Sequence, residues 1–301
     1  MNLLAGLVDD AGLFPPAQLP MSEALARHRA DQRAGYPMLS HRFLCPASRI
    51  GELRADPALA EWGGGHPGAA GDGGTPSAAS ARRALHRPLR LGLILDTGLD
   101  ELPAALAEVA AERRLGLELV EVPAPTAGDV GAALDALAGV GAAAFVEGAR
   151  DPGWVKALAA RHPPESGGPL RGAKVRCGGA RAELFLSPEE LAAFVCTCFE
   201  HGVPFKATAG LHGAVRHRDD PTGFVHHGFL NLVLAAVRAA SGAPVDGVAA
   251  VLASTDGPAL AAEARAVSGR ELAAARLLFR AYGSCSTSEP REEAVALGLL
   301  G

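Results

Sequence analysis

Two lysines of the sequence lie in short apolar runs, where a charged side chain is unexpected. Of the 28 basic residues only three are lysines, Lys156, Lys174 and Lys206. Lys174 lies in the run 173–177 and Lys206 in the run 204–208, and each precedes a glycine by four residues. A buried ammonium is costly unless it is paired or loses its proton. A second cation nearby lowers the pKa of an amine, which can then attack a carbonyl and form a Schiff base. We therefore predict that both lysines are catalytic.

Two glutamates and an arginine end neighbouring apolar runs and are expected beside the lysines. Glu121 and Glu147 are the predicted catalytic proton-transfer groups. The alternatives are that these carboxylates only neutralise the lysines in a buried ion-pair network, or that the lysines point outward. Arg176 shares a face with Lys174 because side chains two apart in a strand point the same way. Its planar fork would hold a substrate carboxylate or phosphate, or it pairs with Glu147 across the strands.

The elements that must position these residues alternate along the chain. Apolar runs of strand length are separated by segments of helical period, among them 21–35, 99–114, 129–140, 151–162, 187–202 and 228–242. Such βα units predict a parallel sheet with helices outside it, and eight units in about 300 residues favour a closed (β/α)8 TIM barrel. The eight runs are 3–8, 42–45, 89–95, 117–122, 142–147, 173–177, 204–208 and 278–283.

An open doubly wound sheet is the alternative fold. The turn after the first run reads DDAGLFPPA, without the GxGxxG pattern that binds a dinucleotide, and we expect no cofactor. The composition changes at 63–80, which is rich in Gly, Ala and Pro and predicts a flexible insertion in a single domain. The competing interpretation is a linker between two domains.

Catalytic groups of TIM barrels lie at the carboxyl ends of the strands and in the loops that follow. Beyond Arg176, this rule selects further polar or small residues as the substrate-binding set. Asn231 is expected on the first turn of a helix, where a capping role is the alternative. The set comprises Asp9, Thr208, His212, Asn231, Gly283, Ser284 and Ser286.

The two lysine runs, KVRCG and KATAG, resemble the two-lysine arrangement of the class I deoxyribose-phosphate aldolases. The last run, FRAYGSCS, is similar to the ending with which those enzymes close the barrel. The resemblance implies that Lys174 forms the Schiff base and that Lys206 lowers its pKa, or that these roles are exchanged. It also places Gly283 and Ser284 near a substrate phosphate. Arg176 departs from the family, which has a small hydroxyl residue there.

A second resemblance covers other segments. The stretches AGLFPPA, KATAGLH and YGSCS are similar to a bacterial family of uncharacterised proteins, so the aldolase likeness can be ancestral. Asp9, Glu121 or Glu147 would replace a carboxylate of the aldolases that has no convincing match in the first half of the chain.

A loop rich in histidine carries the main alternative function. His212, His217, His226 and His227, together with Glu121 or Glu147, would bind Zn²⁺ or Mn²⁺ in a metal-dependent hydrolase or isomerase. Their spacing matches no ligand signature, so we assign no metal. A third alternative is a non-catalytic barrel that binds an anion through Arg176 and the Gly283–Ser284 turn.

Composition limits the partners. The net charge of −5 makes nucleic acid an unexpected partner, and no apolar run is long enough to span a membrane. Five cysteines without a paired framework favour a reducing compartment, and we expect a cytoplasmic protein. The expected substrate is a small, anionic carbonyl compound processed by a lyase of the aldolase type. A homo-oligomer is compatible with the sequence.

Overall fold

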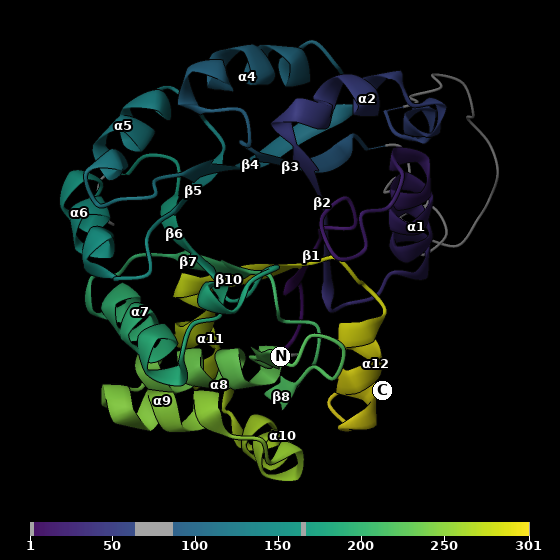
Figure 1. Ribbon diagram of the computed structural model, residues 1–301. Coiled ribbons are helices and arrows are strands. Elements are labelled where there is room, and N and C mark those ends of the chain that lie inside the picture. The colour runs from purple at the N-terminus through teal and green to yellow at the C-terminus, as the bar shows by residue number, and fades with distance from the viewer. Residues whose placement is uncertain (1–2, 64–86, 164–166, 301) are drawn as a thin grey trace.

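The computed structural model describes residues 3–63, 87–163 and 167–300, and these form one closed parallel barrel. The order of the strands around it is β1-β10-β7-β6-β5-β4-β3-β2, which confirms the predicted TIM barrel (Figure 1). Its strands are β1 (Val8–Asp10), β2 (Leu39–Pro46), β3 (Leu89–Ile94), β4 (Leu115–Pro123), β5 (Ala143–Glu147), β6 (Arg171–Arg176), β7 (Phe205–Thr208) and β10 (Phe279–Ser284).

Helices surround the barrel, and α8, α9, α10 and α11 gather on one side of it (Figure 1). Three helices, α9 to α11, occupy a segment between residues 243 and 278 to which the sequence prediction assigned no element. The described helices are α1 (Met21–Ala34), α2 (Ile50–Ala55), α4 (Leu102–Ala110), α5 (Asp129–Ala136), α6 (Gly153–Arg161), α7 (Pro188–Glu200), α8 (Phe229–Ala240), α9 (Val245–Ala253), α10 (Gly257–Ala266), α11 (Gly269–Leu278) and α12 (Glu289–Ala296).

Local sequence signals explain where α7 begins and ends. The Ser187 side chain accepts a hydrogen bond from the backbone N–H of Glu190, and the Glu190 carboxylate accepts one from the backbone N–H of Ser187. This reciprocal pair satisfies two N–H groups that the first turn leaves unpaired. Just after the helix, Gly202 adopts a φ of 64°, a conformation that glycine reaches without the strain of a Cβ.

The first strand lies later in the chain than predicted. The run 3–8 reads as a strand, but β1 begins only at Val8 and continues to Asp10. Gly6 has a φ of 60° and interrupts the extended backbone, so Leu4 lies in a turn over residues 3–6 and Leu7 follows it, both buried in the outer core. The prediction of a strand over 3–8 was wrong for this reason.

Two predictions concern the chain outside the barrel. The insertion expected at 63–80 lies, apart from Gly63, outside the described residues. Among the helices that the structure describes, none has the length and apolarity needed to cross a membrane.

The apolar side chains form an outer core and a small inner one. The large core lies between strands and helices, whereas the lumen contains a separate cluster of Ala11, Leu44, Leu119 and Phe145. Because neighbouring residues of a strand point to opposite faces, the residues two positions from these also point inward. Several of those inward positions carry charge.

Candidate active site

The two strand lysines meet inside the barrel. Lys174 on β6 and Lys206 on β7 are register partners of the parallel pair, and both are buried, with relative exposures of 4% and 1%. Lys156 lies exposed on α6. The expectation that two of the three lysines occupy equivalent places on adjacent strands is therefore met, and their side chains do not point outward.

Glu121 on β4 lies between the two lysines. One carboxylate oxygen, Oε1, accepts a hydrogen bond from Lys206 Nζ at 2.7 Å, while the other, Oε2, forms an ion pair with Lys174 Nζ. Glu121 is itself 3% exposed. β4 and β6 are separated by β5, so the carboxylate reaches across the lumen and places both ammonium groups on one anion.

The row continues toward the carboxyl end of the barrel. Lys174 Nζ also lies 2.7 Å from Oε2 of Glu147, whose other oxygen accepts from Nε of Arg176 at 2.9 Å. Glu147 and Arg176 are more accessible than the lysines, with side-chain exposures of 24% and 43%. Arg176 thus pairs with Glu147, as one alternative predicted, and still presents much of its guanidinium to solvent.

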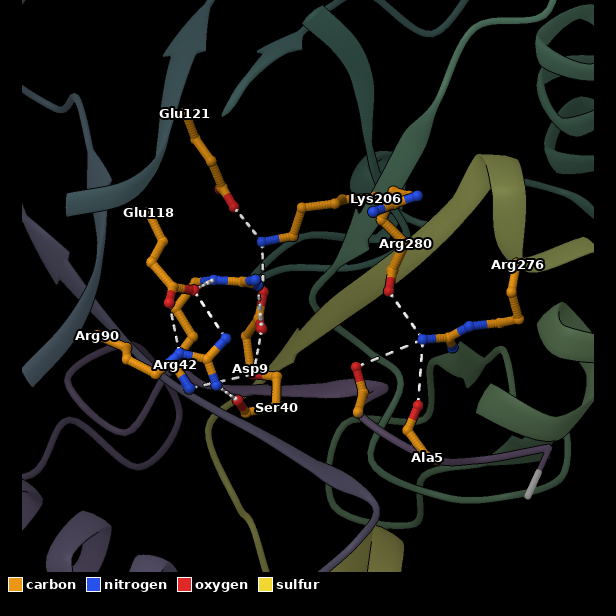
Figure 2. Close-up of polar contacts among 11 residues, drawn as sticks. Ala5, Asp9, Ser40, Arg42, Arg90, Glu118, Glu121, Lys206, Arg276 and Arg280 are labelled. Carbon is orange, nitrogen blue, oxygen red and sulfur yellow. Dashed lines mark hydrogen bonds and ion pairs between the residues drawn. The ribbon is translucent and has the colours of Figure 1, made fainter. Parts of the chain in front are cut away.

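The row also continues toward the amino-terminal end. Asp9 on β1 accepts from Lys206 Nζ at 2.5 Å through Oδ2, and its Oδ1 receives Ser40 Oγ at 2.5 Å and Arg42 Nη1 at 2.6 Å (Figure 2). Arg42 in turn contacts Glu118 through Nε at 3.2 Å. Acidic and basic groups therefore alternate through the lumen, and each lysine touches two carboxylates. We call Asp9, Lys206, Glu121, Lys174, Glu147 and Arg176 the lumen row.

This alternation sets the proton affinities. Burial alone would lower the pKa of Lys174, but the carboxylates of Glu121 and Glu147 outweigh burial and raise it above its usual value. Burial would raise the pKa of Glu121, yet the two ammonium groups lower it to about 2. The prediction that crowding by cations lowers the pKa of Lys174 was wrong, because a carboxylate separates the cations. Lys174 is therefore an ammonium when no substrate is bound.

The glycines that follow the lysines have a packing role. A Cβ added to Gly178 would lie 3.1 Å from the Cα of Gly210, and one added to Gly210 would lie 3.1 Å from the carbonyl oxygen of Cys177. Gly210 also has a φ of 69°. The loops after β6 and β7 thus approach each other backbone to backbone, and the shared lysine-to-glycine spacing reflects this contact.

Three of the predicted substrate-binding residues lie at the carboxyl end of the barrel or just after it, and their contacts differ. Thr208 lies on β7 next to Gly283 of β10 at the carboxyl end, where Thr208 Oγ1 would be 3.4 Å from a Cβ on that glycine. Ser284 is buried, and its Oγ lies 3.3 Å from Nδ1 of His212. Ser286 accepts a hydrogen bond from the backbone N–H of Glu289 and so supports the start of α12.

Asn231 has a structural role. Its side-chain oxygen accepts from the backbone N–H of Arg216, and its Nδ2 donates to the carbonyls of Val251 and Ser254. The residue is fully buried on α8 and ties the preceding loop to α9. The structure therefore does not bring Asn231 to the lumen row, and its amide is used by backbone groups.

The histidines of the loop do not converge. His217 and His226 stack with ring centroids 5.6 Å apart on the short hairpin of β8 (His217–Arg218) and β9 (Val225–His226). His227 is buried and contacts the carbonyl of Leu186 through Nε2 at 2.8 Å, and burial lowers its pKa to about 4. Within the described ranges, no three His, Cys, Asp or Glu side chains are placed to hold a metal ion.

Cys177 directly follows Arg176, the last residue of β6. A thiol beside Lys174 and Arg176 would have a lowered pKa. Cys177 instead points into the apolar core, and burial raises its pKa to about 12 despite Arg176. It is a packing residue, because it is fully buried in the apolar core while the preceding Arg176 points to the other face of the strand.

Sequence reasoning missed the partners of Asp9. Ser40 and Arg42 both come from β2, two residues apart, and Arg42 precedes the inward-facing Leu44 by two. Extending the strand's alternation from Leu44 toward its start would have placed both side chains in the lumen. The predicted run began at residue 42, which hid this pattern.

Comparison with known proteins adds no further constraint. No protein-family model matches the chain, and no curated protein matches it.

Proposed function

We propose that the chain is a lyase of the Schiff-base aldolase type that acts on a small anionic carbonyl compound. One observation carries the proposal: two buried lysines share a single buried carboxylate inside a barrel. An amine for attack, a carboxylate to take its proton and a second cation are then within one hydrogen-bonded row. This is the set of groups that Schiff-base catalysis requires.

Lys174 is the proposed nucleophile. Of its two carboxylate partners, Glu147 is more accessible than Glu121, with side-chain exposures of 24% and 3%, so a substrate arriving at the carboxyl end meets Glu147 and Lys174 before Lys206. A substrate that displaces one carboxylate from Lys174 weakens the electrostatic stabilisation of its ammonium form. Its proton then passes to Glu147, which is already 2.7 Å away.

The reaction follows from these positions. The neutral amine adds to the substrate carbonyl, and the adduct loses water after Glu147 returns a proton to its hydroxyl, which leaves a cationic iminium. The iminium accepts the electron pair of the adjacent carbon–carbon bond as the substrate hydroxyl loses its proton to a carboxylate, and an aldehyde leaves. Protonation of the resulting enamine and hydrolysis by water restore Lys174. Arg176 is the proposed contact for a substrate phosphate or carboxylate.

Borohydride trapping tests the proposal directly. Incubation with pyruvate, acetaldehyde or glyceraldehyde 3-phosphate and borohydride should leave a reduced adduct that peptide mass spectrometry maps to Lys174. K174M should abolish the adduct, and K156M, on the exposed face of α6, should leave its yield unchanged. Because the chain has only three lysines, each can be scored separately.

Two outcomes would reject Schiff-base chemistry at the strand lysines, and a third would move it from Lys174 to Lys206. No adduct with any of these carbonyls would remove the Schiff-base mechanism. An adduct on Lys156 in the same yield as on Lys174 would show only nonspecific amine chemistry. An adduct on Lys206 that survives K174M would exchange the roles of the two strand lysines.

A further inference from the structure

A cavity opens at the amino-terminal end of the barrel, opposite the end where TIM barrels place catalytic groups. Its volume is about 430 Å³. Ala5 and Gly6, which precede β1, line it together with Leu170, which precedes β6, and Arg280, near the start of β10. All eight barrel strands are parallel, so these positions lie at one end of the barrel.

The walls of the cavity carry an excess of positive charge. Arg42, Lys206, Arg276 and Arg280 line it, and Glu118 is the one carboxylate among its described lining residues. Arg42 and Lys206 are bound to carboxylates of the lumen, as described above. Within the described chain, neither Arg276 nor Arg280 lies within ion-pair distance of a carboxylate. Two guanidinium groups therefore remain uncompensated.

Arg276 is held in place with one nitrogen unused. Its Nη2 donates to the carbonyls of Ala5 at 3.2 Å, Gly6 at 3.4 Å and Arg280 at 3.1 Å (Figure 2). Its Nη1 is buried and has no acceptor among the residues that the structure describes. A buried donor without a partner is destabilising. Burial and the charge of Arg280 lower the pKa of Arg276 to about 10, and the carboxylate of Asp9 only partly offsets this shift.

We propose that this cavity binds a small organic oxyanion, a molecule bearing phosphate or carboxylate groups, with Arg276 and Arg280 as its main contacts. A guanidinium presents paired N–H donors that match the oxygens of either group. The cavity is larger than a single inorganic ion requires, and Leu119, Phe145 and Leu272 supply apolar wall for a short carbon skeleton. The inference does not depend on the Schiff-base mechanism, because Lys174 and Arg176 do not line the cavity.

Calorimetric titration tests this site with three probes at constant ionic strength: inorganic phosphate, glycerol 3-phosphate and citrate, with chloride as the reference salt. R276M should raise the Kd of the best probe at least tenfold, and R280M should raise it severalfold. R113M removes an exposed arginine from the segment before β4, at the same end of the barrel but outside the cavity. R113M should bind as the wild type does, whereas a Kd raised by R176M and not by R276M would place the probe at Arg176 and overturn the assignment.

The outcomes separate the ligand classes. Binding of glycerol 3-phosphate but not citrate assigns a phosphate ligand, the reverse assigns a carboxylate ligand, and binding of both supports a general oxyanion site. R276K keeps the charge but loses the fork, so it replaces R276M if circular dichroism shows that R276M is unfolded. No binding above that of chloride, or equal Kd values for wild type and the Arg276 and Arg280 variants, would overturn the proposal.

Discussion

The lumen row and the amino-terminal cavity balance their charges in opposite ways. In the lumen row, three carboxylates alternate with three cations, and every lysine nitrogen has two anionic partners. At the amino-terminal end, Arg276 and Arg280 border a cavity without a carboxylate partner among the described residues. A balanced row of charges is stable without a ligand. A pair of cations without carboxylate partners can instead be neutralised by a negatively charged ligand.

The comparison separates the residues that the fold needs for its stability from the residues that a bound ligand would stabilise. Removing one member of a balanced buried network leaves its partners buried without an opposite charge. Removing an uncompensated cation leaves no stranded anion. Substitutions in the lumen row should therefore lower stability, whereas substitutions at Arg276 and Arg280 should weaken ligand binding and affect stability less. Three measurements of stability test this, beginning with the largest expected effect.

Glu121→Gln should be the most destabilising of these changes. The substitution keeps the volume but removes the anion shared by Lys174 and Lys206, which leaves two buried ammonium groups close together. Breaking a buried ion pair typically costs about 3–5 kcal/mol in the free energy of unfolding, measured by urea denaturation at pH 7. E23Q, on the exposed first turn of α1, is the matched control and should stay within about 0.5 kcal/mol of the wild type. A loss as small as that of E23Q would show that the lumen row is hydrated.

The difference between wild type and E121Q should shrink in acid. The ammonium groups lower the pKa of Glu121 in the folded protein from 4.5 to about 2, so this carboxylate stabilises the fold above pH 4.5. That contribution is lost as the pH falls from 4.5 to about 2, and the Gln variant has no such group to titrate. Urea denaturation at a series of pH values measures the gap. A gap that stays constant down to pH 2.5 would contradict the assigned pairing.

Arg280→Met should have the smallest effect on stability. The side chain is exposed, its one described hydrogen bond is a 3.3 Å contact with the carbonyl of Leu277, and its charge acts against that of Arg276. We expect a change within about 0.5 kcal/mol in the unfolding free energy, with a gain favoured at low salt. A loss above about 1 kcal/mol would mean that Arg280 supports the fold, and the contrast between the two ends would fail.

Much of the fold could be predicted because parallel strands are buried on both faces. Such strands read as continuous apolar runs, and the runs at 89–95, 142–147 and 204–208 match β3, β5 and β7 within a residue or two. The first strand escaped this rule. Most apolar residues of the predicted run precede the strand, in or next to a turn at Gly6, and β1 itself ends in two aspartates. The hydrophobic pattern misplaces a strand when the strand itself is charged and the segment before it contains the leucines.

The members of the candidate site could be predicted, and the pairs of Arg176 with Glu147 and of the lysines with the two glutamates were among the alternatives. Lys174, Lys206, Glu121, Glu147 and Asp9 were all expected at strand ends, and all meet in the lumen row. The predicted pKa direction of Lys174 was wrong, because the sequence left open whether cations or carboxylates dominate around this lysine, and only the structure places Glu121 of β4 between the two ammonium groups.

The sequence by itself determined the alternation of strands and helices, the lysine positions and the glycines that follow them. These are local properties, set by the period of the hydrophobic pattern and by backbone sterics. Only the tertiary structure decided that Glu121 lies between two lysines and that Arg276 and Arg280 face one cavity with Arg42. Closure of the barrel brings together strands far apart in sequence, and the energy of a buried charge depends on those distant neighbours.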